Sequence, residues 1–156
     1  MANYNFQKDL PIAKKTELDI AKALENRYNA KILGIENTNK YDILASVAGI
    51  ICTFEIKEDF TCEKTGNVGV EFSCRGKASG IEVSLADFYI YKLHTALHGI
   101  QYVIHKTVEI KEMIKRKSYF RIVNGGDIGS NSMNYLFKYN VFIKTGMLLP
   151  LDKIKE

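Results

Sequence analysis

The chain has 156 residues, of which 46% are hydrophobic and 26% charged, and its formal net charge at pH 7 is +4. This composition is typical of a globular protein and excludes an intrinsically disordered chain. At about 150 residues per domain, the length predicts a single domain over residues 1–156. No apolar run reaches the roughly 18 residues of a membrane-spanning helix, so we expect no membrane partner.

The N-terminal residues lack the apolar segment of a signal peptide. The three cysteines, Cys52, Cys62 and Cys74, follow neither a zinc-binding nor a disulfide spacing, which favours reduced thiols and a cytoplasmic protein. The small positive charge permits a polyanionic partner without requiring one.

A helix is predicted from about Lys14 to Ala30, with Thr16 as its N-cap. At about 100° per residue, Glu17 falls in the middle of an apolar stripe, whereas Asp19 falls on the opposite, solvated side. A carboxylate is costly to bury unless it is paired or binds something. Either Glu17 therefore faces a site in the interior, or the first turn frays and exposes it. The stripe consists of Ile20, Ala21, Leu24 and Tyr28.

A β-rich block follows, with turn residues at Gly49 and at 64–67. Its predicted strands are Tyr41–Ala45, Ile50–Lys57 and Val68–Cys74. The later elements alternate between helix and strand, which favours an α/β fold with a central mixed β-sheet flanked by helices. They are a helix Leu85–His98 capped by Ser84 and Asp87, a strand Gln101–His105, a helix Val108–Lys117, a strand Tyr119–Val123, a loop Asn124–Asp127, and a segment Tyr135–Ile143 of either type.

Asp42 lies near the start of one predicted strand, and Glu55 and Lys57 lie near the end of the next. Alternate residues of a strand share a face, so a hairpin brings Asp42 beside Glu55, with Lys57 on the same side. Two carboxylates with a lysine suit Mg²⁺ and phosphodiester hydrolysis, because the metal activates a water and the lysine offsets phosphate charge. The alternative is a solvated strand face with ordinary cross-strand pairing.

At these residues the sequence resembles the PD-(D/E)XK nuclease superfamily, in particular small phage-type endonucleases and Holliday-junction resolvases. The resemblance covers roughly residues 16–87 and rests on the helix bearing Glu17, on YDIL with Asp42, and on TFEIK with Glu55 and Lys57. It continues through KTGNVGVEF and RGKASGIEVSLADFYIY. It departs from the family pattern at Tyr41, where a proline is usual.

The resemblance implies a restriction-endonuclease-like core and a metal-dependent DNA endonuclease acting on duplex or branched DNA in a bacterial or phage-infected cell. Asp42, Glu55 and the Ile56 carbonyl would bind Mg²⁺ or Mn²⁺, Lys57 would be the catalytic lysine, and Glu17 would be an additional acid. The alternative is a catalytically inactive DNA-binding or protein-interaction module with the same fold. Cutting two strands with one small domain favours a homodimer.

Glu71 is expected on a strand beside that of Glu55, either as a further member of the site or in an ordinary cross-strand salt bridge. The turn at 65–67 and the basic residues further along are candidates for DNA phosphate contacts. For each of them a plain turn or a solvated helix face is the alternative. These candidates are Thr65, Asn67, Arg75, Lys77, Lys115, Arg116 and Lys117.

Overall fold

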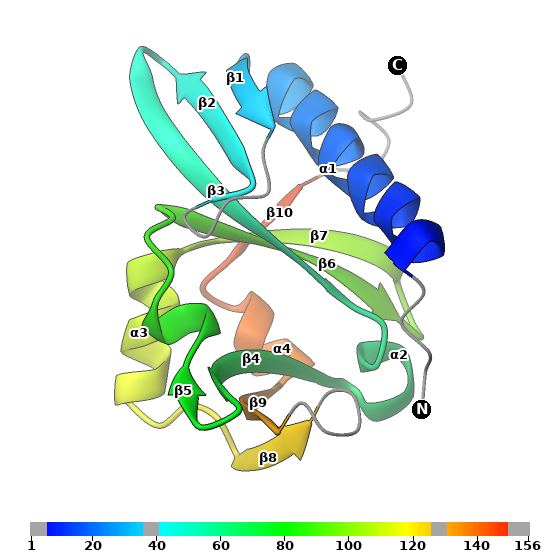
Figure 1. Ribbon diagram of the computed structural model, residues 1–156, viewed down its shortest axis with the longest axis vertical. Helices are drawn as coiled ribbons and strands as arrows, with labels where there is room; N and C mark the ends of the chain where they lie inside the picture. The colour runs from blue at the N-terminus through cyan, green and yellow to red at the C-terminus, as the bar shows by residue number, and fades with distance from the viewer. Residues whose placement is uncertain (1–5, 36–40, 126–130, 150–156) are drawn as a thin grey trace.

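The computed structural model describes residues 6–35, 41–125 and 131–149, and within these ranges the strands form two sheets (Figure 1). The larger sheet has the order β1-β2-β3-β6-β7-β10, and the smaller has the order β5-β4-β9-β8. The strands of the larger sheet are β1 (Lys31–Ile35), β2 (Ile43–Val47), β3 (Ile50–Asp59), β6 (Phe88–Thr95), β7 (Gly99–Lys106) and β10 (Met147–Leu149). The strands of the smaller sheet are β4 (Asn67–Cys74), β5 (Lys77–Ala78), β8 (Arg121–Gly125) and β9 (Ser132–Lys138).

The larger sheet is mixed, because β3 pairs with β6 in parallel while all its other neighbouring strands pair antiparallel to each other. Helices pack beside this sheet, which confirms the predicted α/β class with a central mixed sheet, whereas the second sheet was not predicted. The helices are α1 (Phe6–Tyr28), α2 (Cys62–Thr65), α3 (Thr107–Lys115) and α4 (Tyr139–Ile143), with a 3₁₀ turn η1 (Gly80–Glu82). Within the described residues, no helix is both long and apolar enough to cross a membrane.

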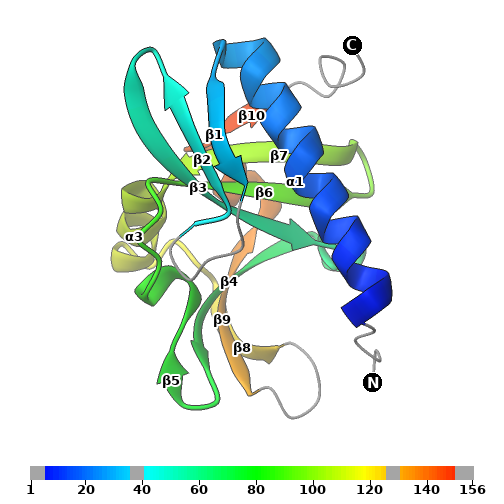
Figure 2. The ribbon, with the colours of Figure 1, turned by 45° about the horizontal axis from the view of Figure 1, so that its top comes forward.

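Each face of the larger sheet is covered by a different layer (Figures 1 and 2). Helix α1 lies across one face, where Ile20 and Leu24 pack with Phe54 of β3 and Ile90 of β6. The smaller sheet, α3 and α4 cover the other face, where side chains of β6 and β7 join the second apolar cluster. A fully buried side chain of this kind contributes about 1.5–3 kcal/mol, so both layers are held mainly by apolar burial. The largest members of the second cluster include Tyr89, Tyr91, Phe137 and Phe142.

The hairpin between β2 and β3 turns at Ala48 and Gly49, which both have positive φ angles, 52° and 81°. A two-residue turn of this handedness matches the twist of the strands it connects. The predicted turn at Gly49 is therefore confirmed, and its register pairs Ile43 with Phe54.

The first helix begins earlier than the pattern predicts. Because α1 already starts at Phe6, Thr16 is not an N-cap but lies buried within the helix, 3% exposed. Its hydroxyl donates to Glu58 Oε1 at 3.3 Å and accepts from Lys92 Nζ at 3.1 Å.

The helix predicted over Leu85–His98 is wrong, because this segment forms strand β6 and the turn that follows it. Neither side chain caps a helix: Ser84 Oγ accepts from the nearby Ala86 N–H, and Asp87 Oδ2 accepts from the N–H and hydroxyl of Thr53, 34 residues earlier in the chain. Such side-chain bonds to the backbone compete with helix formation. The segment then alternates between the two apolar clusters, as a central strand requires.

The remaining predicted helices and strands are confirmed in kind, with shifted ends. The ambiguous segment Tyr135–Ile143 contains both types, since β9 ends at Lys138 and α4 begins at Tyr139. Asn124 and Gly125, predicted as loop, end strand β8, while Asp127 lies outside the described residues. No disulfide joins Cys52, Cys62 or Cys74 in the described residues, as expected.

Substitution of two glycines with positive φ tests how closely the 3₁₀ turn η1 packs against β4. A Cβ at Gly80 (φ 52°) would collide with the backbone carbonyl of Glu71, whereas a Cβ at Gly76 (φ 76°) would meet nothing within 4 Å. We expect Gly76→Ala to lower the free energy of unfolding by about 1–2 kcal/mol, the cost of the left-handed backbone alone. Gly80→Ala should lose about 4 kcal/mol or more. Denaturant unfolding of both variants measures this, and equal losses would contradict the close contact.

Candidate active site

Asp42 is held against β3 at the end of the β2–β3 hairpin. Its N–H donates to the Phe54 carbonyl at 2.9 Å, which continues the ladder beyond Ile43 and sets Asp42 opposite Glu55. Its carboxylate Oδ2 accepts from the Ile56 N–H at 2.8 Å. The predicted juxtaposition of Asp42 and Glu55 is therefore present, with the aspartate clamped by the backbone of the neighbouring strand.

Glu55 and Lys57 share the face of β3 that looks away from α1. Lys57 Nζ lies 3.5 Å from Glu55 Oε1, and their side chains are 39% and 21% exposed. Phe54 and Ile56 point to the opposite face, into the cluster beneath α1. This alternation follows from strand geometry and was expected from the sequence.

Glu17 is 5% exposed, as its position in the apolar stripe predicts. Burial is the main cause of its raised pKa, the charge of Asp42 is the next, and Glu55 adds to both, while Lys14 opposes them. The carboxylate on the helix is thus within electrostatic reach of the two carboxylates on the strands. Asp19 differs: its side chain is 25% exposed and pairs with Lys15 at 2.8 Å.

The two strand carboxylates also have raised pKa values, and burial is the main cause for both. The Ile56 N–H and Lys57 oppose the rise for Asp42. For Glu55, Lys57 opposes the rise and the charge of Asp42 adds to it. Asp42 thus raises the pKa of both Glu55 and Glu17. Negative charge crowded in this way favours a bound cation, and carboxylate oxygens suit Mg²⁺ or Mn²⁺.

Among the described residues, no three acidic, histidine or cysteine side chains are grouped so that they could hold a metal ion. Glu17, Asp42 and Glu55 interact through their charges without forming such a group. Ile56 takes part through its N–H, and its carbonyl as a metal ligand stays a prediction.

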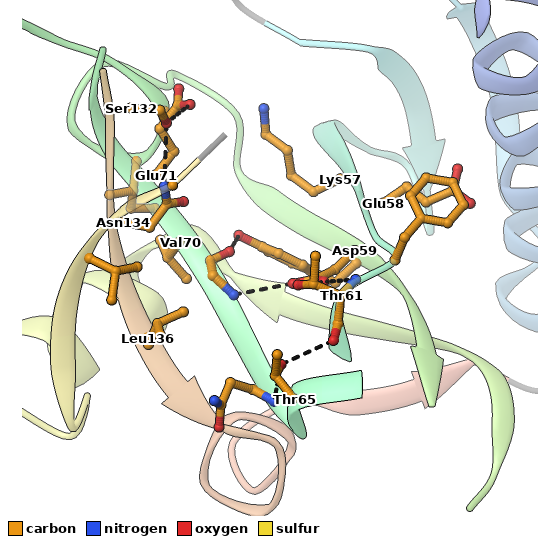
Figure 3. A pocket seen from close by; sticks show the side chains of 18 of the residues that line it. Lys57, Glu58, Asp59, Thr61, Thr65, Val70, Glu71, Ser132, Asn134 and Leu136 are labelled. Atoms are coloured by element: carbon orange, nitrogen blue, oxygen red, sulfur yellow. Dashed lines mark hydrogen bonds between the residues drawn. The ribbon is translucent and has the colours of Figure 1, made fainter. Parts of the chain in front are cut away.

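Glu71 is not where the sequence placed it, because β4 pairs with β5 and β9 and is not a neighbour of β3. Its Oε1 accepts from the Ser132 hydroxyl at 2.7 Å, and its Oε2 accepts from the Ser79 hydroxyl at 3.0 Å. Glu71 therefore forms neither the predicted cross-strand salt bridge nor a part of the site beside Glu55. Glu71 instead lines a cavity that separates it from Lys57 (Figure 3).

That cavity, of about 700 Å³, lies between β3 and β6 on one side and β4, β8 and β9 on the other. Sequence reasoning missed its central residues. Tyr89 and Tyr91 of β6 are the register partners of Glu55 and Lys57 and line the cavity. The sequence FYIYKL at 88–93 could have indicated them, because alternate residues of a strand point to opposite faces and this places both tyrosines on one face.

Tyr89 is 1% exposed, and burial raises the pKa of its hydroxyl to about 12, with Glu55, Asp42 and Glu71 adding to the rise. Ser84 lowers this pKa, although its hydroxyl does not reach hydrogen-bond geometry with Tyr89. Tyr89 therefore remains a neutral donor at neutral pH, set among three carboxylates.

The candidate DNA contacts do not form one surface. Thr65 and Asn67 lie at the start of β4, where Gly66 has the positive φ expected of a turn. Arg75 and Lys77 lie beyond the other end of this strand, whose eight residues span about 26 Å. The remaining three, Lys115, Arg116 and Lys117, lie at the end of α3, where Arg116 pairs with Glu112 at 3.0 Å. Of these candidates, Thr65 and Asn67 border the cavity.

No model of a known protein family, no curated protein and no solved structure matches this chain.

The pKa of Glu17 predicts how its removal changes stability with pH. Because its pKa is raised above the ordinary 4.5, the folded chain binds this proton more tightly than the unfolded chain. The free energy of unfolding therefore falls as pH rises from about that value through the raised pKa. Without metal, Glu17→Gln should melt at a higher temperature than the wild type at pH 7.5, and the difference should shrink towards pH 4.

Asp19→Asn is the matched control on the same helix. It removes an exposed pair with Lys15, worth at most about 1 kcal/mol, so it should leave the melting temperature nearly unchanged or slightly lower. A Glu17→Gln variant that is less stable than the wild type at pH 7.5 would contradict the assignment of crowded negative charge.

Proposed function

We propose that this chain is a metal-dependent DNA endonuclease of the PD-(D/E)XK type, with a restriction-endonuclease-like core. The observation that carries the proposal is the pairing of Asp42 and Glu55 across the β2–β3 hairpin, with Lys57 3.5 Å from Glu55 and Glu17 buried within reach of both carboxylates. Perturbed ionisable groups gathered beside a cavity are typical of functional sites.

In this proposal Asp42, Glu55 and the Ile56 carbonyl hold Mg²⁺ or Mn²⁺, and Glu17 contributes a further negative charge. The metal, when bound, polarises the scissile phosphate and lowers the pKa of the attacking water. The hydrogen bond from the Ile56 N–H holds the Asp42 carboxylate against β3, beside Glu55. The Lys57 ammonium, partly exposed at the edge of the site, offsets charge that develops on the phosphate.

The substrate in this proposal is duplex or branched DNA. Exposed basic side chains occur in the β4–β5 turn and at the end of α3, so contacts with phosphates would come from several elements. Hydrolysis of both strands by a chain of this size would require two copies, which favours a homodimer. The reduced thiols suit a cytoplasmic enzyme.

The alternative is a catalytically inactive DNA-binding or protein-interaction module with the same fold. One observation favours it: the described residues contain no three-ligand metal group. Both functions predict DNA or protein binding, but only the first predicts hydrolysis.

A plasmid-nicking assay across a Mg²⁺ and Mn²⁺ titration separates the two functions. The wild type should nick supercoiled plasmid, and Asp42→Asn or Glu55→Gln should lower the rate by at least about 100-fold, because each removes a metal-binding charge. Glu25→Gln, which changes an exposed acid of α1, should cut at the wild-type rate. If the wild type binds DNA but never cuts it with either metal, the inactive module is the correct function.

Lys57 tests the chemistry rather than the metal. Lys57→Ala should reduce turnover by about 100-fold to 1,000-fold, as removal of one charge-stabilising donor does, while DNA affinity changes little. Lys57→Arg should also be slow, because a planar guanidinium does not replace a compact ammonium. Single-turnover rates and fluorescence anisotropy with the same DNA provide the two measurements. An arginine variant with the wild-type rate would show that the lysine has no specific role.

A further inference from the structure

The cavity between the sheets has the size of a pocket for one small molecule. Its volume of about 700 Å³ falls within the range of roughly 300–1,000 Å³ that is typical of ligand sites. Lys57 is common to this cavity and to the proposed active site. The cavity therefore meets the proposed active site at this side chain.

The charges of the cavity are unevenly distributed. Lys57 is the cationic side chain among its lining residues, whereas three of them are acidic: Asp59, Glu71 and Glu58, whose carboxylate pairs with Lys92 and His94. Asp59 accepts four hydrogen bonds, from the N–H and hydroxyl of Thr61 and from the N–H groups of Cys62 and Gly69. Its carboxylate therefore serves the local structure.

Glu71 is bound differently. Each of its oxygens accepts one serine hydroxyl, from Ser132 and Ser79, whereas a carboxylate can accept about four hydrogen bonds. Asn134 stands beside it and donates to Ser132 Oγ at 3.3 Å. This wall suits a neutral group that donates hydrogen bonds, and it would repel a phosphate. The phosphate of a ligand would therefore stay near Lys57.

Aromatic rings stand at the same cavity. Phe60 lines it while remaining 58% exposed, and one face of its ring is stacked on His94 with ring centroids 4.4 Å apart. A ring supported on one side and open on the other is a platform for stacking a planar base. Tyr89, 1% exposed, brings a hydroxyl for which no hydrogen-bond partner is found among the described residues.

We propose that this cavity binds one nucleoside monophosphate unit, with its phosphate near Lys57 and its base between Phe60 and the wall formed by Glu71 and Asn134. For its substrate, this proposal rests on the proposed nuclease function. A base that is paired in a duplex cannot enter a pocket for one nucleotide, so the nucleotide must be unpaired, flipped out of the stack, or free. The site would then act on DNA at a bulge, flap, junction or frayed end.

The test compares two fluorescein-labelled DNA duplexes in EDTA, one fully paired and one with a single unpaired adenosine nucleotide. We expect fluorescence anisotropy to give at least about tenfold tighter binding of the duplex with the unpaired nucleotide. Free deoxyadenosine monophosphate, but not inorganic phosphate, should compete for the pocket. Competition by the free nucleotide without a preference between duplexes would identify a free nucleotide as the ligand. Equal binding of both duplexes together with no competition would overturn the proposal.

Two variants with matched controls locate the binding. Gly69→Val narrows the cavity, since a Cβ there already lies 3.4 Å from Asn134 Oδ1, whereas Gly34→Val in β1 enters open space. Phe60→Ala removes the exposed ring, and Phe120→Ala removes a ring of similar exposure that does not line the cavity. Gly69→Val should abolish the preference, and Phe60→Ala should weaken nucleotide binding by about tenfold, while both controls bind as the wild type does. Because Phe60 is exposed, its variant keeps the test valid if Gly69→Val fails to fold.

The failure of the pocket and the failure of the nuclease are distinguishable in the same preparation. If the protein nicks plasmid with Mg²⁺ but shows neither preference nor competition, the nuclease stands and the pocket is wrong. If the free nucleotide competes and Phe60→Ala weakens its binding, but no metal supports cleavage, the proposed pocket is correct and the proposed nuclease function is wrong.

Discussion

The parallel pairing of β3 with β6 in the middle of the larger sheet sets the positions of most other features. It aligns Glu55 with Tyr89 and Lys57 with Tyr91 on one face. The intervening Phe54 and Ile56 are turned to the other face, beneath α1. A central strand pair has two faces to cover, so the sheet needs α1 on one side and the second sheet with α3 and α4 on the other. The cavity is the part of the second face that these layers leave open.

Glu58 and Glu55 lie on opposite faces of β3, and their charges are compensated to different degrees. Glu58, beneath α1, lies 2.7 Å from His94 Nε2 and 3.4 Å from Lys92 Nζ, and it accepts a hydrogen bond from Thr16. A partly buried charge with this many partners is well compensated. Glu55, on the open face, has one lysine at 3.5 Å and a neighbouring aspartate that raises its pKa. Crowded negative charge lowers the stability of the folded chain, and such uncompensated charge is the common condition of sites that bind cations.

The resemblance to the nuclease superfamily and the architecture of the chain are separate questions. The residues that carry the resemblance influence one another: Asp42 accepts from the Ile56 N–H, and the charges of Asp42 and Glu55 raise the pKa of the buried Glu17. The segment that should form the next helix is instead a central strand, and β4 joins a second sheet. Function follows from the placement of particular side chains more closely than from the fold around them, so the chemistry proposed for Asp42, Glu55 and Lys57 depends on their own geometry.

The sequence by itself determined the features that depend on local periodicity. Glu17 is buried because helical spacing puts it in an apolar stripe, and Asp42 lies beside Glu55 because a two-residue turn at Ala48 and Gly49 fixes the hairpin register. Strand alternation likewise put Glu55 and Lys57 on one face. Each of these results follows from contacts between residues that are near in the chain or joined by one turn.

Only the tertiary structure decided the features that depend on long-range pairing. The segment 85–98 carries a helix-capping pattern, but Asp87 bonds to Thr53 and the following residues complete the sheet between β3 and β7. Glu71 lies across a cavity from Lys57 because β4 pairs with β9, about sixty residues later in the chain. Local signals are weak, about 1 kcal/mol for a helix cap, whereas burying the aromatic side chains of a central strand contributes several times more, and no local pattern reveals which strands will pair.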